Sequence, residues 1–267
     1  MKVYFFRGVI FIFLFLVLGK FNLAYPFEGL EAIDVRSISL GQLKALSQGL
    51  TNPAYVPFSE HKQVGVSVFN RFEMKELGTR CIFGLFPNRL IDLNCRLSTF
   101  GYDEYQLIEG QAGFAKKITQ KFAIGTSVGF LTKNSILEER VQTCLFADIS
   151  LFWQINEALE WALTTENLIH TRNFQPVFCF TGIKYQLVPT ACILMETGFD
   201  SQKRFSVNAG IEYEMVRQLT VRGGFRNNPR MPSLGFAYRV EQWNIETAFQ
   251  FHPELGVSSG ISASYFF

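Results

Sequence analysis

Three histidines are the side chains of this chain best suited to acid–base chemistry near neutral pH. His61 precedes the first apolar segment, His170 lies in a connection and His252 ends a segment. A hydrolase would need one of them oriented by an acidic group and placed beside a nucleophile. None has a repeated acidic partner. We therefore expect no enzyme and no catalytic residue, and we interpret the histidines as solvated rim or loop residues.

The five cysteines offer little further chemistry. They are odd in number and lack the Cys-x-x-Cys spacing of redox or metal sites. We interpret them as small apolar side chains, and we expect Cys81, Cys95 and Cys179 on the outer faces of strands. The other two are Cys144 and Cys192. No metal cluster or phosphate-binding glycine loop stands out, so the sequence predicts neither a metal nor a cofactor.

Charged side chains recur on the polar face of alternating segments, and we expect them to face a lumen. They are Arg71, Arg80, Asp92, Arg96, Glu109, Asp148, Glu196, Glu212, Glu214, Arg222, Arg226, Arg239 and Glu246. One interpretation is an electrostatic ladder that holds strands and an inner segment together, and the other is a polar permeation path. Such charges cost little when hydrated or paired, but about 2–4 kcal/mol on a lipid-facing surface near the membrane midplane.

Strict alternation of apolar and polar residues is the pattern that must position these charges. In the last seven residues, Ile261, Ala263, Tyr265 and Phe267 share one face, and Ser262, Ser264 and Phe266 share the other. A period of two predicts a strand. From Val64 onward we count about 14 such segments, each near the length of a membrane strand plus its turn. The sequence predicts an all-β, 14-stranded antiparallel transmembrane β-barrel, with Tyr265 and Phe267 as a C-terminal insertion signal.

The N-terminal region has a different texture. Lys2 and Arg7 precede the apolar run 8–19, which is too short to span a bilayer, so we predict a signal peptide over residues 1–24. Residues 25–62 lack strand alternation and are expected to form a plug, with at most a short helix at Leu43, Leu46 and Leu50. The barrel is expected over residues 63–267. The net charge of +2 is carried partly by the predicted signal, and nothing indicates nucleic-acid binding.

A soluble β-sandwich is the alternative fold, since its strands alternate too. Aromatic residues make up 15% of the chain and charged residues 18%, which favours a surface that faces lipid. A closed barrel also removes the open edges that so many strands would expose. Aromatic side chains lie near segment ends, as in an interfacial girdle. These are Trp153, Trp161, Tyr185, Tyr238 and Trp243.

Two short motifs precede the first segment: Arg36-Ser37-x-x-Leu40-Gly41 and Asn52-Pro53-Ala54. In this order before a predicted barrel, they resemble the N-terminal signature of FadL/PorV-like outer-membrane proteins. The run 70–80 resembles a subset of PorV/PorQ-related chains. The resemblance implies a bacterial outer-membrane barrel whose N-terminal segment fills the lumen. The chain departs from the family in its Gly41-Gln-Leu-Lys stretch and in its shorter loops.

The resemblance implies binding or passage of a small hydrophobic molecule. An accessory subunit of a type IX-like secretion system, acting through partner contacts, and a purely structural barrel are the alternatives. Expected partners are outer-membrane lipid, the barrel-assembly machinery during insertion, and either the small molecule or a secretion-system subunit. Within the lumen we expect Arg36 or the Asn52–Ala54 turn to contact acids such as Glu212 or Glu246.

Overall fold

A computed structural model describes residues 34–136, 138–172, 176–202 and 204–267. The predicted signal peptide and the first part of the predicted plug, residues 25–33, lie outside the described residues. Among those described, no helix has the length and apolar character needed to cross a membrane.

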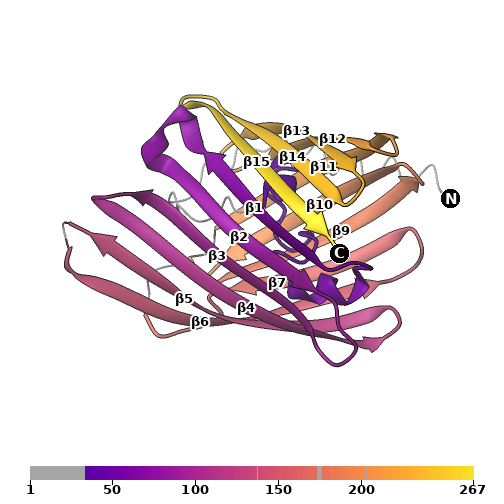
Figure 1. Ribbon diagram of the computed structural model, residues 1–267, viewed down its shortest axis with the longest axis horizontal. Helices are drawn as coiled ribbons and strands as arrows, with labels where there is room; N and C mark the ends of the chain where they lie inside the picture. The colour runs from indigo at the N-terminus through magenta and orange to yellow at the C-terminus, as the bar shows by residue number, and fades with distance from the viewer. Residues whose placement is uncertain (1–33, 137, 173–175, 203) are drawn as a thin grey trace.

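The strands form a closed antiparallel barrel (Figure 1). Neighbours in sequence pair around the wall, β15 pairs with β1, and β5 pairs with β6 to complete the circle. The strands are β1 (Gln63–Asn70), β2 (Gly78–Phe86), β3 (Asp92–Tyr102), β4 (Tyr105–Thr119), β5 (Phe122–Ser135), β6 (Glu138–Gln154), β7 (Leu159–Glu166), β8 (Ile169–His170), β9 (Phe178–Val188), β10 (Ala191–Asp200), β11 (Phe205–Val216), β12 (Leu219–Arg226), β13 (Met231–Val240), β14 (Trp243–His252) and β15 (Gly256–Phe266).

The wall is interrupted between β7 and β8, which lie in succession along β6. Pairing with β6 reaches Ser150↔Thr164 and resumes only at Ala147↔Ile169. In the gap, the Thr165 hydroxyl accepts the Ile149 N–H at 2.9 Å, in place of a backbone carbonyl. The short β8 therefore continues β7. When β7 and β8 are counted as one strand of the wall, the barrel has the 14 strands that the alternation predicts. The predicted fold is confirmed.

The apolar face of the strands points outward, as predicted. On β1, for example, Val66 is 50% exposed while Ser67 is buried. The predicted girdle residues lie at the barrel end that carries the C-terminus, where Trp153 pairs directly with Trp161 and Trp243 with Tyr265. An aromatic band at one end of an apolar surface is typical of a barrel in a membrane interface.

Strand β2 is the exception, because its predicted facing is wrong. Cys81 and Phe83 are buried on the inner face, whereas Ile82 is 64% exposed and Arg80 is also exposed. Cys81 therefore does not face outward, and Arg80 does not face the lumen. The inner face of β2 is apolar because Leu50 of the N-terminal segment packs on Cys81 and Phe83. A shift of one residue reverses every side chain of a strand.

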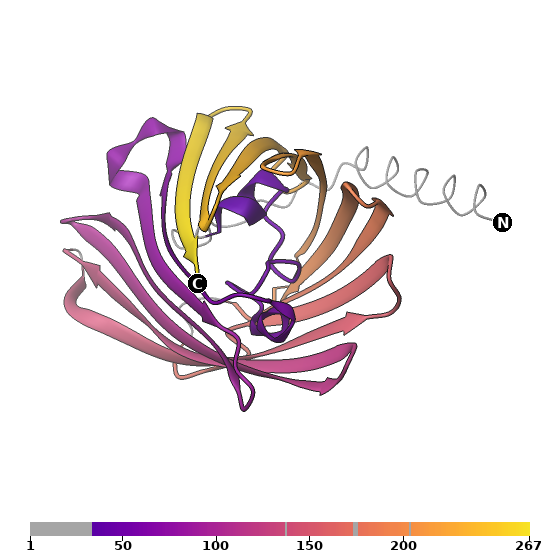
Figure 2. The ribbon, with the colours of Figure 1, turned by 45° about the vertical axis from the view of Figure 1, so that its right-hand side comes forward.

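The N-terminal segment lies inside the barrel (Figure 2). Its short helix α2 (Val35–Ser39) begins at Asp34, whose side chain accepts the Ser37 N–H. Asn52 caps the 3-10 helix η1 (Pro53–Phe58) in the same way. Residues 43–51 form turns rather than the helix expected at Leu43, Leu46 and Leu50. Leu43 and Leu46 are buried in one apolar cluster and Leu50 in another, which fixes their facing without a helix. Two further 3-10 turns, η2 (Arg71–Glu73) and η3 (Lys75–Leu77), join β1 to β2.

Glycines on the inner wall let the two motif segments approach closely. A Cβ at Gly224 would lie 2.2 Å from the Gly41 N atom, and one at Gly210 would lie 2.8 Å from the Leu40 carbonyl oxygen. On the opposite wall, a Cβ at Gly125 would lie 2.8 Å from the Ala54 N atom. Both motifs therefore dock where the wall has no side chain.

Candidate functional site

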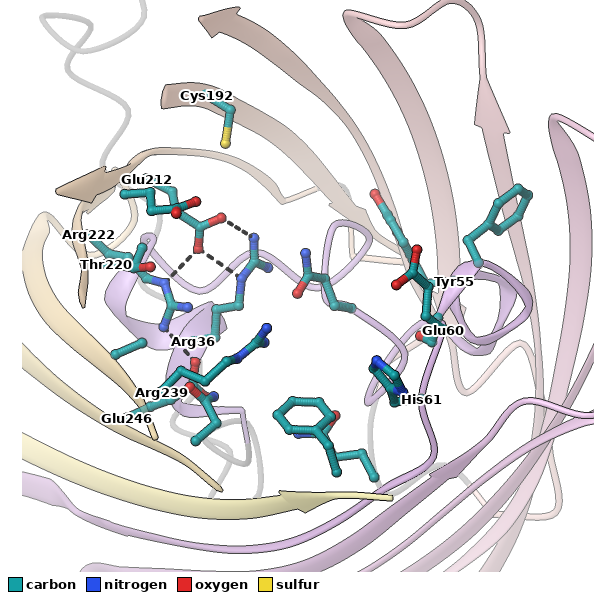
Figure 3. Close-up of a pocket in the computed structure, with 18 of the residues that line it drawn as sticks. Arg36, Tyr55, Glu60, His61, Cys192, Glu212, Thr220, Arg222, Arg239 and Glu246 are labelled. Atoms are coloured by element: carbon teal, nitrogen blue, oxygen red, sulfur yellow. Dashed lines mark hydrogen bonds and ion pairs between the residues drawn. The ribbon is translucent and has the colours of Figure 1, made fainter. Parts of the chain in front are cut away.

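A cavity of about 580 Å³ occupies the barrel end that carries the C-terminus (Figure 3). Charged side chains line it from both the wall and the N-terminal segment. The basic residues are Arg36, Lys184, Arg217, Arg222 and Arg239, with His61, and the acidic residues are Asp34, Glu60, Glu160, Glu212, Glu214 and Glu246. The near balance of charges makes this a hydrated, polar chamber rather than a site for an apolar ligand.

Four of these charges form a continuous chain of ion pairs at the inner side of the cavity. The Arg36 guanidinium donates two hydrogen bonds to the Glu212 carboxylate, each of 3.0 Å. Arg222 donates from Nε to Glu212 at 2.6 Å and from Nη1 to Glu246 at 2.7 Å. The chain links α2 to strands β11, β12 and β14. Its side chains point toward one another in Figure 3, opposite His61 and Glu60.

The electrostatics of Arg36 follow from its neighbours. Burial, the largest single effect, would lower the pKa of this guanidinium, but the nearby carboxylates of Glu212, Asp34 and Glu246 together raise it more, so Arg36 stays charged. Burial raises the pKa of Asp34 above the usual range of an aspartate, although a hydrogen bond from the Ser47 hydroxyl at 2.7 Å acts in the opposite direction. Charged at the site, Arg36 can hold its carboxylate partner across the physiological pH range.

A second anchor holds the middle of the N-terminal segment. The Glu196 carboxylate, on β10, accepts the backbone N–H groups of Lys44, Ala45 and Leu46 at 2.9, 2.7 and 3.3 Å. Lys44 Nζ lies 2.5 Å from Glu166 Oε2, beside the interruption between β7 and β8. This anchor therefore connects the N-terminal segment to the irregular part of the wall.

Amide side chains form the third set of contacts. Asn52 Nδ2 donates to the Ala45 carbonyl at 2.7 Å, and its Oδ1 accepts the Ala54 N–H at 3.0 Å. Asn94 Nδ2 donates to the Gly49 carbonyl at 2.6 Å. The structure thus brings Asn52, Pro53 and Ala54 against β3–β6 rather than against an inward acid, whereas Arg36 lies on Glu212.

The other lumen-facing charges lie at several places. Arg96 pairs with Glu109 at 2.5 Å and donates to the Leu50 carbonyl at 3.0 Å. Asp148 accepts the Leu168 N–H at 3.1 Å, at the wall interruption. Arg226 donates to Gln42 Oε1 at the tip of the N-terminal segment.

Three more of the predicted charges lie near the two barrel ends. Arg71 is buried 5.7 Å from the Phe100 ring, and Arg239 lies 4.8 Å from the Phe266 ring. The Asp92 carboxylate accepts the Asn88 N–H at 2.8 Å, within the turn between β2 and β3. These charges have local partners and do not line a continuous path.

Gln42, Lys44 and Asn94 also join the N-terminal segment to the wall, and none of them is among the predicted site residues. Glu166 and Lys184 occupy polar positions of the alternating stretches 159–166 and 177–186, and the structure pairs them with Lys44 and Glu160. For these two residues, the alternation of apolar and polar positions predicts that the side chain faces the lumen. Gln42 and Lys44 lie in a segment without periodicity, where no pattern predicts the direction of a side chain.

The lumen also contains buried apolar clusters. Leu40, Leu43 and Leu46 pack with wall residues such as Phe178 and Leu194. Toward the opposite end, Phe100, Leu107, Leu131 and Phe146 form a second cluster on the inner faces of β3–β6. The interior of a water-filled barrel is polar. We refer to the second group as the inner-wall apolar cluster.

The groups able to do acid–base chemistry are dispersed. His61 lies on the cavity, His170 Nδ1 contacts the Asn167 carbonyl at 2.9 Å, and His252 Nδ1 accepts the Leu255 N–H at 3.1 Å. Gly-x-Ser-x-Gly stretches occur within β5 and β15, but Ser127 and Ser258 accept hydrogen bonds there from Gln111 and Phe72. In the described ranges, no three His, Cys, Asp or Glu residues form a group able to hold a metal.

The two residues of the predicted insertion signal lie together at the end of the last strand. Phe267 is 54% exposed, and its ring stacks 6.2 Å from that of Tyr265. Phe266 points the other way and lines the cavity. The role of Tyr265 and Phe267 in insertion stays a prediction.

Solved structures with the same architecture include a transporter and a channel for aromatic hydrocarbons. The toluene transporter TodX of Pseudomonas putida superposes with a TM-score of 0.67 at 11% identity, covering 89% of this chain and 99% of that one. The monoaromatic hydrocarbon channel CymD gives 0.66 at 12% identity, covering 89% and 98%. A Pseudomonas aeruginosa FadL homologue gives 0.63 at 10% identity, covering 87% and 98%.

Identity this low establishes the fold alone: the chain has the fold of FadL-like bacterial outer-membrane barrels. A scan against protein-family models gives no match, and neither does a search of curated protein sequences. The resemblance to PorV/PorQ-related chains stays a prediction.

Proposed function

We propose that this protein lies in the bacterial outer membrane and lets small hydrophobic molecules pass. The inner-wall apolar cluster is the observation that carries the proposal. Phe100, Leu107, Leu131 and Phe146 face the lumen at the end opposite the C-terminus, where a barrel that passes water-soluble solutes would have polar side chains. An apolar solute that enters there removes its own apolar surface from water, which contributes about 25 cal/mol per Å².

The fold supports the same proposal. The architecture matches proteins described as a toluene transporter and a monoaromatic hydrocarbon channel over nearly the whole of their chains. Solutes of that class are small and apolar, which fits a lumen whose apolar surfaces are formed by separate clusters rather than by one wide pore.

The interruption between β7 and β8 lies beside the inner-wall apolar cluster. Phe146 of the cluster is on β6, directly opposite His170 of β8. The regular β6–β7 ladder has ended before this point, and the wall is joined there by the Thr165 hydroxyl and the Asp148 carboxylate. Such a junction is weaker than a continuous ladder of backbone hydrogen bonds. This favours a wall that can change shape at the interruption when a solute enters.

Uptake of labelled toluene by intact cells tests the proposal. Three strains that lack their own hydrocarbon channel would each express one protein: the wild type, the Phe146→Gln variant or the Phe146→Leu variant. We expect uptake above the empty-vector level for the wild type and for Phe146→Leu, which keeps the wall apolar. Phe146→Gln should lower uptake severalfold at equal amounts of folded barrel. Uptake equal to the empty vector for the wild type would refute the proposal.

We propose no enzymatic activity, which agrees with neighbours described as transporters or channels. Outer-membrane lipid and the barrel-assembly machinery remain the proposed partners. The secretion-system subunit and the purely structural barrel stay alternatives, and no contact surface among the described residues favours either over passage of a hydrophobic molecule.

A further inference from the structure

The charged cavity poses a question that the passage of apolar molecules does not answer. It extends from the barrel end at the C-terminus into the lumen, up to α2, and its charged lining favours hydration. A 14-stranded barrel with a hydrated lumen would conduct ions unless something closes it. The residues at the inner side of the cavity must therefore determine whether ions can cross the barrel.

The ion-pair chain Arg36–Glu212–Arg222–Glu246 lies at this boundary. Every member lines the cavity, and their side chains are 18% exposed or less. Signs alternate along the chain, so positive and negative charges compensate. A mobile ion that displaced one member would leave its partner buried and uncompensated, which is strongly unfavourable.

Arg36 also joins two parts of the N-terminal segment. Its Nη1 atom donates to the Leu46 carbonyl at 3.4 Å, in addition to the two bonds to Glu212. Leu46 in turn packs against Gly182 on the wall. Behind the ion pairs, Ser39 and Gly41 are hydrogen bonded to Ser233. The charged chain is thus backed directly by packed backbone of the N-terminal segment.

We infer that the Arg36–Glu212–Arg222–Glu246 chain is the ion seal of the barrel. It closes the inner side of the aqueous cavity and makes the protein exclude ions and water-soluble solutes. These four residues determine the exclusion of ions and water-soluble solutes. That role does not depend on whether toluene-like molecules pass elsewhere in the lumen.

Conductance of the purified full-length barrel in planar bilayers tests this inference, with heat-modifiable gel migration as the check of folding. Glu212→Gln leaves Arg36 and Arg222 with one positive charge too many, and Arg36→Met leaves the carboxylates with one negative charge too many. Rings of bases favour anions in pores, and rings of acids favour cations. We expect conductance several times that of the wild type for both, with reversal potentials of opposite sign in a salt gradient.

Glu214→Gln is the matched control. Glu214 follows Glu212 by two residues, lines the same cavity and makes no ion pair among the described residues. It should stay as closed as the wild type. A second variant of the chain, Glu246→Gln on β14, removes the negative charge that pairs with Arg222 at this end and should also conduct.

Three results would overturn the seal. They are variants of the chain that stay closed, a Glu214→Gln barrel that opens as much as Glu212→Gln, and equal reversal potentials for Glu212→Gln and Arg36→Met. The last would indicate general loosening of the N-terminal segment. None of these results depends on toluene uptake, so the seal and the proposed passage can fail separately.

Discussion

The Glu196 carboxylate accepts the backbone N–H of Lys44 at 2.9 Å. It also accepts the backbone N–H groups of the next two residues, Ala45 and Leu46. Glu196 is only 1% exposed. Three consecutive N–H groups that converge on one buried carboxylate fix the direction of the chain where it turns inside the barrel. The N-terminal segment is therefore held by the wall at residues 44–46 as well as at Arg36.

Replacing Glu196 with Gln should loosen residues 44–46. The amide keeps one acceptor oxygen but brings an NH₂ group toward backbone donors, so part of the contact is lost, at a cost of about 1–3 kcal/mol. Hydrogen exchange read by mass spectrometry should show peptides over 43–48 exchanging about tenfold faster or more. Peptides over β15 serve as the internal reference. Unchanged exchange at 43–48 would contradict the anchor.

Adjacent glycines of β12 give a matched test of the close docking. A Cβ at Gly224 would meet the backbone of Leu40 and Gly41 at 2.2 Å, whereas a Cβ at Gly223 meets nothing within 4 Å. We expect Gly224→Ala to lower stability by about 1–3 kcal/mol, the usual cost of overpacking. Gly223→Ala should leave it unchanged. The midpoint of heat-modifiable gel migration measures both, and equal midpoints would refute close docking.

The architecture was predictable because the strands of a barrel wall have a local sequence pattern. A period of two fixes which side chains share a face, and the outward-facing set is mostly apolar. Alternation predicts the wrong facing for β2, because apolar residues occupy both of its faces. The lumen is not polar there, since Leu50 of the N-terminal segment packs on Cys81 and Phe83 at the inner face.

The site was predictable only in part, because its contacts join distant residues. The direction of Arg36 and Glu212 could be expected from motif and alternation, but they are 176 residues apart and meet only when the barrel closes around the N-terminal segment. Lys44 carries no periodic signal at all. Its position depends on Glu196, whose own register is set by β9 and β11.

Asn52 should tolerate loss of its side chain better than gain of a charge. Asn52→Ala removes a helix cap, which costs about 0.5–2 kcal/mol. Asn52→Asp keeps the acceptor for the Ala54 N–H but turns a carboxylate oxygen toward the carbonyls of Ala45 and Leu151, where Nδ2 now donates. We expect the aspartate variant to have the lower melting midpoint and the lower folded yield. The reverse order would count against the assigned contacts.

Deletion of Phe267 should impair assembly far more than Phe266→Ser. Phe267 ends the outward row and stacks on Tyr265, whereas Phe266 faces the cavity. If the outward aromatic is part of an insertion signal, the deletion should leave little heat-modifiable protein in the outer-membrane fraction, and Phe266→Ser should assemble normally. Equal membrane yields for wild type and the Phe267 deletion would argue against the signal.

Removal of residues 26–58, with the signal retained, should turn a closed barrel into an open channel. The deleted stretch contains α2, the turns held by Glu196 and the 3-10 helix η1, so it includes the parts that cross the lumen. The wall strands pair with one another, and their ladder does not depend on this stretch. The deletion variant should therefore still fold, with normal heat-modifiable migration, while its conductance in planar bilayers rises well above that of Glu212→Gln, which opens only one side of the lumen. A folded deletion variant with wild-type conductance would show that the N-terminal segment does not close the barrel.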